Sequence, residues 1–296
     1  MFKTLRGIFC ALLLTINLVI CGLAIIIIGV ISWPIPSKTW NHYSNKSMQG
    51  IPVLWGCLNH YILSISLHNK FDISGSGTLS RKKWYIMLSN HQSWMDILII
   101  TSIFYKQIPC LKFFMKQQLL WQLPFAGLAC YFLGFPFMKR HSRTQIRKHP
   151  ELKQQDIITT KKACQKFREF PTTVINFSEG TRFTHDKHKR QQSPYDHLLK
   201  PKAGGTAVAI NEMFDILSGI IDVTINYKTL DKKQLNMWEL ICGKIDKLQL
   251  HYELLPITND LKGDYFIDRK FRSQLQHWIN DIWKRKDKRL SELKND

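Results

Sequence analysis

The sequence begins with a long segment that carries no charge. No Asp, Glu, Lys or Arg occurs from Gly7 to Ser37, and residues 8–33 are almost continuously apolar. A helix that crosses a bilayer needs about 20 apolar residues, so this segment is long enough. A signal peptide has a shorter apolar region of about 7–15 residues before a small-residue cleavage site. Here the segment ends in Trp33-Pro34-Ile35-Pro36, which predicts an uncleaved membrane helix.

A second apolar segment, residues 51–67, is interrupted by polar side chains. It predicts either a helix that lies in the membrane interface or the returning arm of a hairpin. Basic residues flank the first segment on both sides, namely Lys3, Arg6, Lys38 and Lys46. That arrangement is compatible with both ends of a hairpin facing the cytoplasm. We therefore predict a membrane anchor over residues 1–68 and a second domain over residues 69–296.

Beyond residue 70, short strand-like runs alternate with helix-like runs. The runs typical of strands are residues 84–88, 110–114, 135–138, 172–177 and 219–227. The runs typical of helices are residues 97–105, 119–133, 156–170 and 203–213, while residues 139–153 and 182–202 are polar and loop-rich. Such alternation predicts an α/β fold in which helices flank a mostly parallel sheet.

The last predicted helix, residues 268–290, places apolar side chains at helical spacing and ends in a basic cluster. Two interpretations fit this pattern. The helix covers the domain and its basic end is solvated, or it contacts a membrane surface.

The chain is strongly basic. It contains 42 Lys and Arg against 22 Asp and Glu, a net charge of +20. Such an excess favours a polyanionic partner, which is a nucleic acid, an anionic membrane or a phosphorylated substrate. The sequence contains no recognisable nucleic-acid reading motif, and the membrane segment also argues against nucleic acid. We predict membrane lipids and a phosphorylated substrate as partners, and no nucleic acid.

The cysteines and histidines give no sign of a metal site. The seven cysteines are odd in number and form no CxxC pair, which indicates reduced thiols. His185, His188 and His197 lie among lysines and arginines, whose positive charge opposes a bound cation. We predict no metal and no cofactor.

The first motif with chemical meaning is Asn90-His91-Gln92-Ser93-Trp94-Met95-Asp96. It follows a predicted strand and opens a predicted helix, which is where a parallel sheet presents its active site. A strand-to-helix turn can bring the carboxylate of Asp96 onto one imidazole nitrogen of His91. The other nitrogen is then able to act as a general base. The spacing alone is also compatible with a structural histidine, and we assign Ser93 to the turn.

The second motif is Asn176-Phe177-Ser178-Glu179-Gly180-Thr181-Arg182, again after a predicted strand. Gly180 permits a backbone conformation that other residues resist. Arg182 can hold a phosphate with paired hydrogen bonds, and Glu179 can orient a neighbouring donor. An ordinary turn with a surface salt bridge is the alternative. Ser178, like Ser93, is predicted to be a turn residue and not a nucleophile.

Together the two motifs resemble those of the glycerophospholipid acyltransferases. That family carries an NHxxxxD block and a later EGTR block, which correspond here to residues 90–96 and 179–182. Between them the family has a GxxFxxR-like block, matched by Gly134, Phe137 and Arg140. A family lysine before a short helix is matched by Lys116. The resemblance covers residues 71–227.

The resemblance implies a direct acyl transfer. His91, oriented by Asp96, would deprotonate the free glycerol hydroxyl of a lysophospholipid, which then attacks an acyl thioester on coenzyme A or acyl carrier protein. Substrate binding would fall to Lys116, Gly134, Phe137, Arg140, Glu179, Gly180, Thr181 and Arg182. The default acceptor of the family is 1-acyl-glycerol-3-phosphate, and the expected location is the cytoplasmic face of a bacterial inner membrane.

The sequence departs from the family pattern at several positions. Ser178 replaces a common proline, Met138-Lys139 replaces an aliphatic–acidic pair, and residues 220–227 lack the prolines of the fourth family block. With residues 199–205, these features resemble the branch that contains lysocardiolipin acyltransferases and their bacterial relatives. A lysophosphatidylglycerol or lysocardiolipin acceptor is therefore an alternative. A catalytically silent lipid-binding protein on the same fold is another.

Overall fold

A sheet of six strands forms the centre of the computed structural model, which describes residues 2–68, 70–138, 158–159, 161–162, 164–229 and 236–295. The strands are β1 (Phe71–Ser76), β2 (Trp84–Ser89), β3 (Leu111–Phe113), β6 (Thr173–Phe177), β7 (Leu217–Lys228) and β8 (Lys247–Leu255). Their order in the sheet is β1-β8-β7-β2-β6-β3, with every neighbouring pair parallel except β7 and β8. The predicted α/β fold with a mostly parallel sheet is confirmed.

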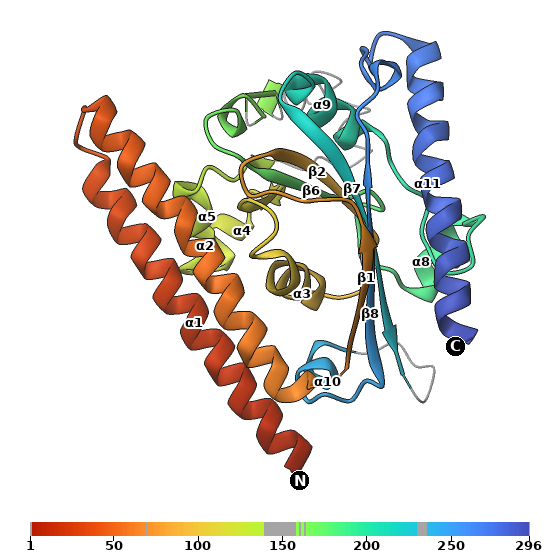
Figure 1. Ribbon diagram of the computed structural model, residues 1–296, viewed down its shortest axis with the longest axis horizontal. Helices are drawn as coiled ribbons and strands as arrows, with labels where there is room; N and C mark the ends of the chain where they lie inside the picture. Colours follow the sequence, from red (N-terminus) through yellow and green to blue (C-terminus); the bar gives the residue numbers. More distant parts are fainter. Residues whose placement is uncertain are drawn as a thin grey trace.

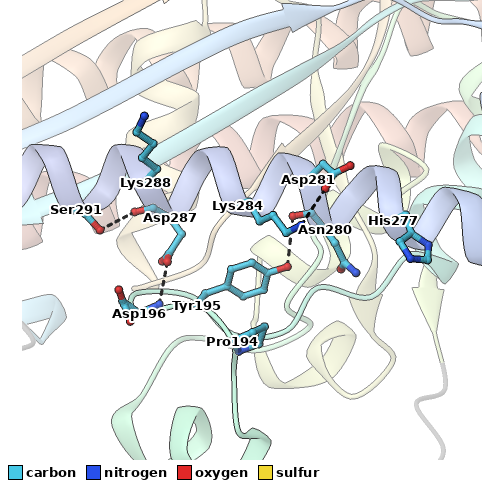
Figure 2. A pocket seen from close by; sticks show the side chains of 10 residues that line it. All are labelled: Pro194, Tyr195, Asp196, His277, Asn280, Asp281, Lys284, Asp287, Lys288 and Ser291. Atoms are coloured by element: carbon cyan, nitrogen blue, oxygen red, sulfur yellow. Dashed lines mark hydrogen bonds and ion pairs between the residues drawn. The ribbon is translucent and has the colours of Figure 1, made fainter.

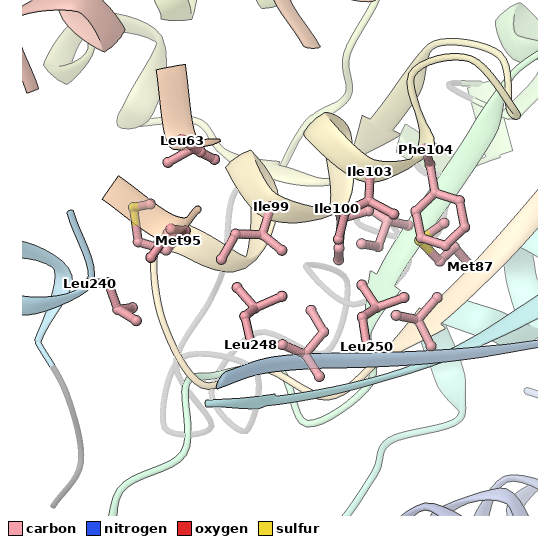
Figure 3. Close-up of a cluster of buried hydrophobic side chains, with 14 of the residues drawn as sticks. Leu63, Met87, Met95, Ile99, Ile100, Ile103, Phe104, Leu240, Leu248 and Leu250 are labelled. Carbon is pink, nitrogen blue, oxygen red and sulfur yellow. The ribbon is translucent and has the colours of Figure 1, made fainter. Parts of the chain in front are cut away.

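The central strand β2 is buried on both faces. Tyr85 and Met87 point to one face, where they join a core cluster with helix α3 (Met95–Phe104). Figure 3 shows this core, in which Ile99 and Ile100 of α3 lie above Leu248 and Leu250 of β8. Alternate residues of a strand face opposite sides of a sheet, so a continuous apolar run is what a two-sided core requires.

The opposite face of the sheet is covered by α9 (Gly204–Met213) and the C-terminal helix α11 (Arg269–Asn295). Ile86 and Leu88 of β2 share a core cluster with Ile282 and Trp283 of α11. In Figure 1, α11 lies on the far side of the sheet from the two N-terminal helices. These contacts support the domain-covering interpretation of the last helix.

Two long antiparallel helices form the N-terminal part, α1 (Phe2–Ser32) and α2 (Lys38–Leu67) (Figure 1). Helix α2 begins well before residue 51 because Ser37 caps it, accepting the Trp40 N–H at 3.3 Å. The Asn17 side chain donates to Asn59 Oδ1 at 2.8 Å and so fixes the register of the pair. Both helices are long and apolar enough to cross a membrane.

The helix pair also packs on the rest of the chain. Cys10 and Leu14 of α1, with Leu63 and Leu67 of α2, join the core cluster of α3. The first helix, of 31 residues, is about 45 Å long, so it exceeds the roughly 30 Å of a bilayer core. Its outer face presents apolar side chains such as Ile8, which is 52% exposed. The division at residue 68 stays a prediction.

A small unit lies between the helix pair and the sheet. It contains β4 (Met115–Lys116), α4 (Leu119–Gln122), α5 (Ala126–Phe132) and β5 (Phe137–Met138). The predicted helix over residues 119–133 is thus two short helices, separated at Leu123-Pro124-Phe125. Residues 139–153 lie outside the described residues, as does part of the predicted helix over residues 156–170.

The remaining elements are α8 (His185–Gln191), α10 (Met237–Ile241) and the 3₁₀ turn η1 (Asn259–Leu261). Helix α8 lies in a segment that we predicted to be loop-rich. It forms because Thr184 caps its first turn, accepting the Lys187 N–H at 3.3 Å. The parallel strands β2, β3, β6 and β7 end at one edge of the sheet, where an α/β protein presents its ligand site.

Candidate active site

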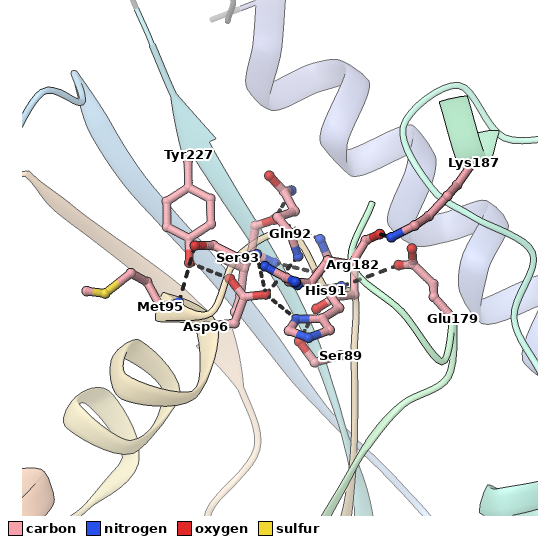
Figure 4. A network of polar contacts seen from close by, with 12 residues as sticks. Ser89, His91, Gln92, Ser93, Met95, Asp96, Glu179, Arg182, Lys187 and Tyr227 are labelled. Carbon is pink, nitrogen blue, oxygen red and sulfur yellow. Dashed lines mark hydrogen bonds and ion pairs between the residues drawn. The ribbon is translucent and has the colours of Figure 1, made fainter. Parts of the chain in front are cut away.

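His91 and Asp96 meet at this edge. Strand β2 ends at Ser89, α3 begins at Met95, and the turn between them brings His91 Nδ1 to 2.7 Å from Asp96 Oδ2. Figure 4 shows the pair at the centre of a network of polar contacts. The contact that the sequence predicts across the turn is therefore present.

The surroundings of Asp96 fix the tautomer of His91. Asp96 Oδ2 also accepts the backbone N–H groups of Gln92, at 2.7 Å, and Ser93, at 3.0 Å. A carboxylate held by so many donors is an acceptor, so the proton of the imidazole belongs on Nδ1. The lone pair of His91 is then on Nε2, which is the atom that a general base needs.

His91 is held in place by a stacking contact on its ring and by a hydrogen bond to its backbone carbonyl. Phe177, the last residue of β6, stacks on it with a centroid separation of 4.1 Å and an interplanar angle of 22°. The His91 carbonyl accepts the Phe183 N–H at 2.8 Å. The His91 side chain is 14% exposed while Asp96 is fully buried, so a substrate can reach the base but not the carboxylate.

Asn90 joins the motif to β7. Its side chain donates to the Ile225 carbonyl and accepts the Ile225 N–H, both at 2.9 Å. This paired contact explains why an asparagine precedes His91, since only an amide side chain can both donate and accept in this way.

Glu179 is fully buried and binds two backbone groups. Oε1 accepts the His91 N–H at 3.4 Å, and Oε2 accepts the Leu199 N–H at 3.2 Å. Burial raises the pKa of Glu179 to about 8, although the two backbone donors oppose the shift. Glu179 therefore connects the turn after β2, which carries His91, with the segment that carries Leu199. Its contact with substrate stays a prediction.

The residues after Glu179 form a turn that continues to Phe183, which bonds the His91 carbonyl. Gly180 has a φ of +71°, as the sequence predicts, and a Cβ there would lie 3.3 Å from the Lys202 ammonium. The Thr181 hydroxyl accepts from Lys187 Nζ at 2.9 Å. The Arg182 guanidinium lies over the Trp94 ring, 4.5 Å from its centroid. Stacking occupies the face of the guanidinium, whereas its N–H donors lie along the edge.

The other predicted site residues lie in the small unit beside the sheet. Lys116 is exposed in β4, and β4 pairs in parallel with β5, which carries Phe137. Gly134 has a φ of +76° just before β5, a conformation that favours glycine. Strand β3 leads into this unit from the carboxyl edge of the sheet, so Lys116 follows the same edge as His91. Arg140 lies outside the described residues.

The acyltransferase family model matches residues 70–228, more than half of the chain. The chain belongs to the acyltransferase family. A curated relative, 1-acyl-sn-glycerol-3-phosphate acyltransferase epsilon of Mus musculus, is 25% identical over 231 residues, which are 72% of this chain and 58% of the relative. The delta enzyme of Homo sapiens is 22% identical over 214 residues, 68% of this chain and 51% of that relative.

The chain thus spans little more than half the length of these curated relatives. A similar solved structure is the 1-acyl-sn-glycerophosphate acyltransferase PlsC of Thermotoga maritima. The TM-score is 0.53 at 16% identity, and the match covers 98% of this chain and 96% of that chain. At this identity the likeness supports the fold of the acyltransferase, including its two N-terminal helices.

Sequence reasoning missed several residues that contact the candidate site residues. The Tyr227 hydroxyl donates to Asp96 Oδ1, Lys187 holds the Thr181–Arg182 turn, and Trp94 supports Arg182. Trp94 lies inside the first motif, so its position close to His91 in the sequence was the available signal, and the structure shows its indole half-exposed. Tyr227 is on another strand, so no local spacing points to it.

A hollow of about 400 Å³ lies away from the predicted site residues, between α11 and residues 194–196 (Figure 2). Its lining includes Asp281, Lys284 and Lys288, and none of the predicted site residues. The Asp287 carboxylate at its edge accepts the Asp196 and His197 N–H groups, which makes Asp287 structural. No group of three metal-ligating side chains occurs among the residues that the structure describes.

Proposed function

We propose that the protein is a membrane-anchored acyltransferase that acylates the free glycerol hydroxyl of a lysophospholipid. The proposed acceptor is 1-acyl-glycerol-3-phosphate and the product is phosphatidic acid. One observation carries the proposal, the His91–Asp96 contact of 2.7 Å with Nε2 left as the base. Membership of the acyltransferase family and the names of the curated relatives support the choice of reaction.

The chemistry follows from the tautomer. His91 Nε2 takes the proton of the acceptor hydroxyl, and the oxygen attacks the thioester carbonyl carbon. The resulting C–O bond replaces the C–S bond, and the thiol leaves with the proton returned by His91. Asp96 stabilises the imidazolium between these two steps and fixes the ring. The donor is acyl-CoA or acyl carrier protein, and no metal or cofactor takes part.

The phosphate of the acceptor is assigned to cationic side chains of the motifs. Arg182 is the main candidate. Its guanidinium stacks on the Trp94 ring, and the N–H groups along the guanidinium edge can form paired hydrogen bonds with a phosphate. Lys116 and Arg140 are assigned to the same phosphate. Gly180 and Thr181 shape the turn, and Gly134 and Phe137 shape the neighbouring small unit.

The helices α1 and α2 serve as the membrane anchor in this proposal. Their outer faces carry exposed apolar side chains, including Ile16, Ile27 and Leu54. We place the catalytic domain on the cytoplasmic face of a bacterial inner membrane, since acyl thioesters are made in the cytoplasm. The basic excess of the chain favours an anionic lipid surface.

The test presents the purified protein in detergent micelles with a panel of lysophospholipids and with both donor types. Products are identified by mass spectrometry. Phosphatidic acid from 1-acyl-glycerol-3-phosphate is the expected product, and His91→Ala should form none while keeping its circular dichroism spectrum. A preference for lysophosphatidylglycerol or lysocardiolipin would overturn the acceptor assignment. Full activity of His91→Ala would sink the mechanism, and no product from any acceptor would favour a silent lipid-binding protein.

A further inference from the structure

Tyr227 makes a contact that neither motif contains. It lies near the end of β7, and its hydroxyl donates to Asp96 Oδ1 at 2.5 Å. The two residues are 131 positions apart, so the contact depends on the assembled sheet. Figure 4 shows the phenol approaching the carboxylate from the side opposite to His91.

The two oxygens of Asp96 have different partners. Oδ2 accepts from His91, Gln92 and Ser93, all in the turn after β2. Among the residues that the structure describes, the hydrogen bond found on Oδ1 comes from Tyr227 alone. Since Asp96 is fully buried, loss of the Tyr227 donor would leave Oδ1 unpaired in the protein interior, which is costly.

We propose that Tyr227 is a positioning residue for acyl transfer, which holds the Asp96 carboxylate so that Oδ2 faces His91 and which moderates the pull of that carboxylate on the imidazole. This role rests on the proposed function, in which His91 is the base. The Tyr227 hydrogen bond would have two effects on Asp96. It sets the orientation of the carboxylate through Oδ1, and it draws part of the negative charge towards the phenol.

The ionisation of the phenol fits this role. Burial, with the nearby Asp96 carboxylate, raises the pKa of Tyr227 well above its ordinary value, so the hydroxyl remains a donor. The titratable groups that Figure 4 labels around His91 are Asp96 from α3, Tyr227 from β7, Glu179 and Arg182 from the loop after β6, and Lys187 from α8. Of these groups, Asp96 hydrogen-bonds to His91 Nδ1, and Tyr227 hydrogen-bonds to Asp96 in turn.

The test is Tyr227→Phe, which removes the hydroxyl and keeps the ring. Without the donor, the negative charge of Asp96 acts more strongly on the protonated imidazole of His91 and stabilises that form. The acid limb of the kcat/KM profile should move up by about half a pH unit. We also expect kcat to fall about tenfold with both KM values nearly unchanged.

The matched control is Tyr85→Phe. That tyrosine is also buried, and its hydroxyl accepts one hydrogen bond, from the Ser80 N–H at 3.0 Å, at the amino end of β2. This variant also loses one buried hydrogen bond, so it should show a comparable loss of thermal stability with a wild-type pH profile.

A second readout separates this proposal from the proposed function. The titration of His91 can be followed by NMR of histidine-labelled protein without any turnover. A raised midpoint in Tyr227→Phe but not in Tyr85→Phe supports the role of Tyr227 even if no acceptor on the panel reacts. A wild-type midpoint in Tyr227→Phe, or a wild-type kcat with an unmoved acid limb, overturns it.

Discussion

Two buried aspartates, one at the carboxyl edge of the sheet and one on the face that α11 covers, each pair with a basic side chain. Asp96 binds His91 at the carboxyl edge, and Asp222 of β7 binds Lys286 of α11. Both carboxylates are at most 1% exposed. Their bases differ, because His91 is 14% exposed whereas Lys286 is completely enclosed.

The hydrogen bonds of the two carboxylates also differ. Asp96 has partners on both oxygens, including two backbone N–H groups and the Tyr227 hydroxyl. Asp222 Oδ2 is buried without a partner among the described residues, and Lys286 divides its donors between Asp222, the Val223 carbonyl and Thr224. A fully bonded carboxylate beside a reachable base is suited to proton transfer. A closed pair with an unpartnered oxygen is suited to fixing α11 on β7.

The largest expected effect is that of Asp96→Asn on catalysis. The amide keeps the shape of the carboxylate but loses its charge, and its NH₂ group can favour the wrong tautomer of His91. We expect kcat to fall about 10³–10⁴-fold, measured with saturating acceptor and donor. The counterpart Asp222→Asn should lower the thermal midpoint and leave kcat per folded molecule within about threefold of wild type. A kcat above a tenth of wild type in Asp96→Asn would break the distinction between the pairs.

The next effect is that of Lys286→Met on stability. Removal of the lysine leaves the Asp222 charge buried without a counter-ion, which costs about 3–5 kcal/mol. The double variant Lys286→Met/Asp222→Leu replaces the pair by apolar groups and should recover most of that loss. Thermal or denaturant unfolding in detergent micelles measures both. A double variant no more stable than the single one would contradict an anchoring ion pair.

The sequence predicted the elements that carry strong patterns. Strands β2, β6 and β7 are mostly buried and rich in apolar residues, and the predicted runs agree with each strand to within two residues at either end. Strand β1 was missed because Phe71–Ser76 is almost entirely exposed and so has no apolar pattern. Strand β8 does alternate, with Leu248 and Leu250 facing the core, but its pairing with both β1 and β7 depends on distant residues.

The contacts of the candidate site also differ in how far the sequence predicts them. The His91–Asp96 contact spans five residues, so local spacing across a strand-to-helix turn was enough to predict it. The partners that complete the two pairs come from far along the chain, with Lys286 64 positions from Asp222 and Tyr227 131 positions from Asp96. A buried lysine on a helix with a basic end looks like its solvated neighbours until the packing is known.

The last expected effect concerns Glu179, whose pKa is influenced by a residue of each pair. Lys286 lowers its pKa and Asp96 raises it, but burial dominates and raises the pKa to about 8. The unfolded chain titrates this carboxyl near pH 4.5, so between that value and pH 8 the folded protein holds the extra proton. Stability should therefore fall as the pH rises through this window, by about 1 kcal/mol per pH unit, and level off above it.

Glu179→Gln isolates this contribution, because glutamine stays neutral at every pH. Thermal midpoints of wild type and variant, measured from pH 5 to 9, should converge at the acid end and separate in favour of the variant at the alkaline end. Glu292→Gln, at a carboxyl that is 62% exposed on α11, is the matched control and should follow wild type throughout. A constant gap between Glu179→Gln and wild type would mean that Glu179 is already ionised at pH 5. Its attraction to Lys286 would then outweigh burial, and the two pairs would act as one charge network.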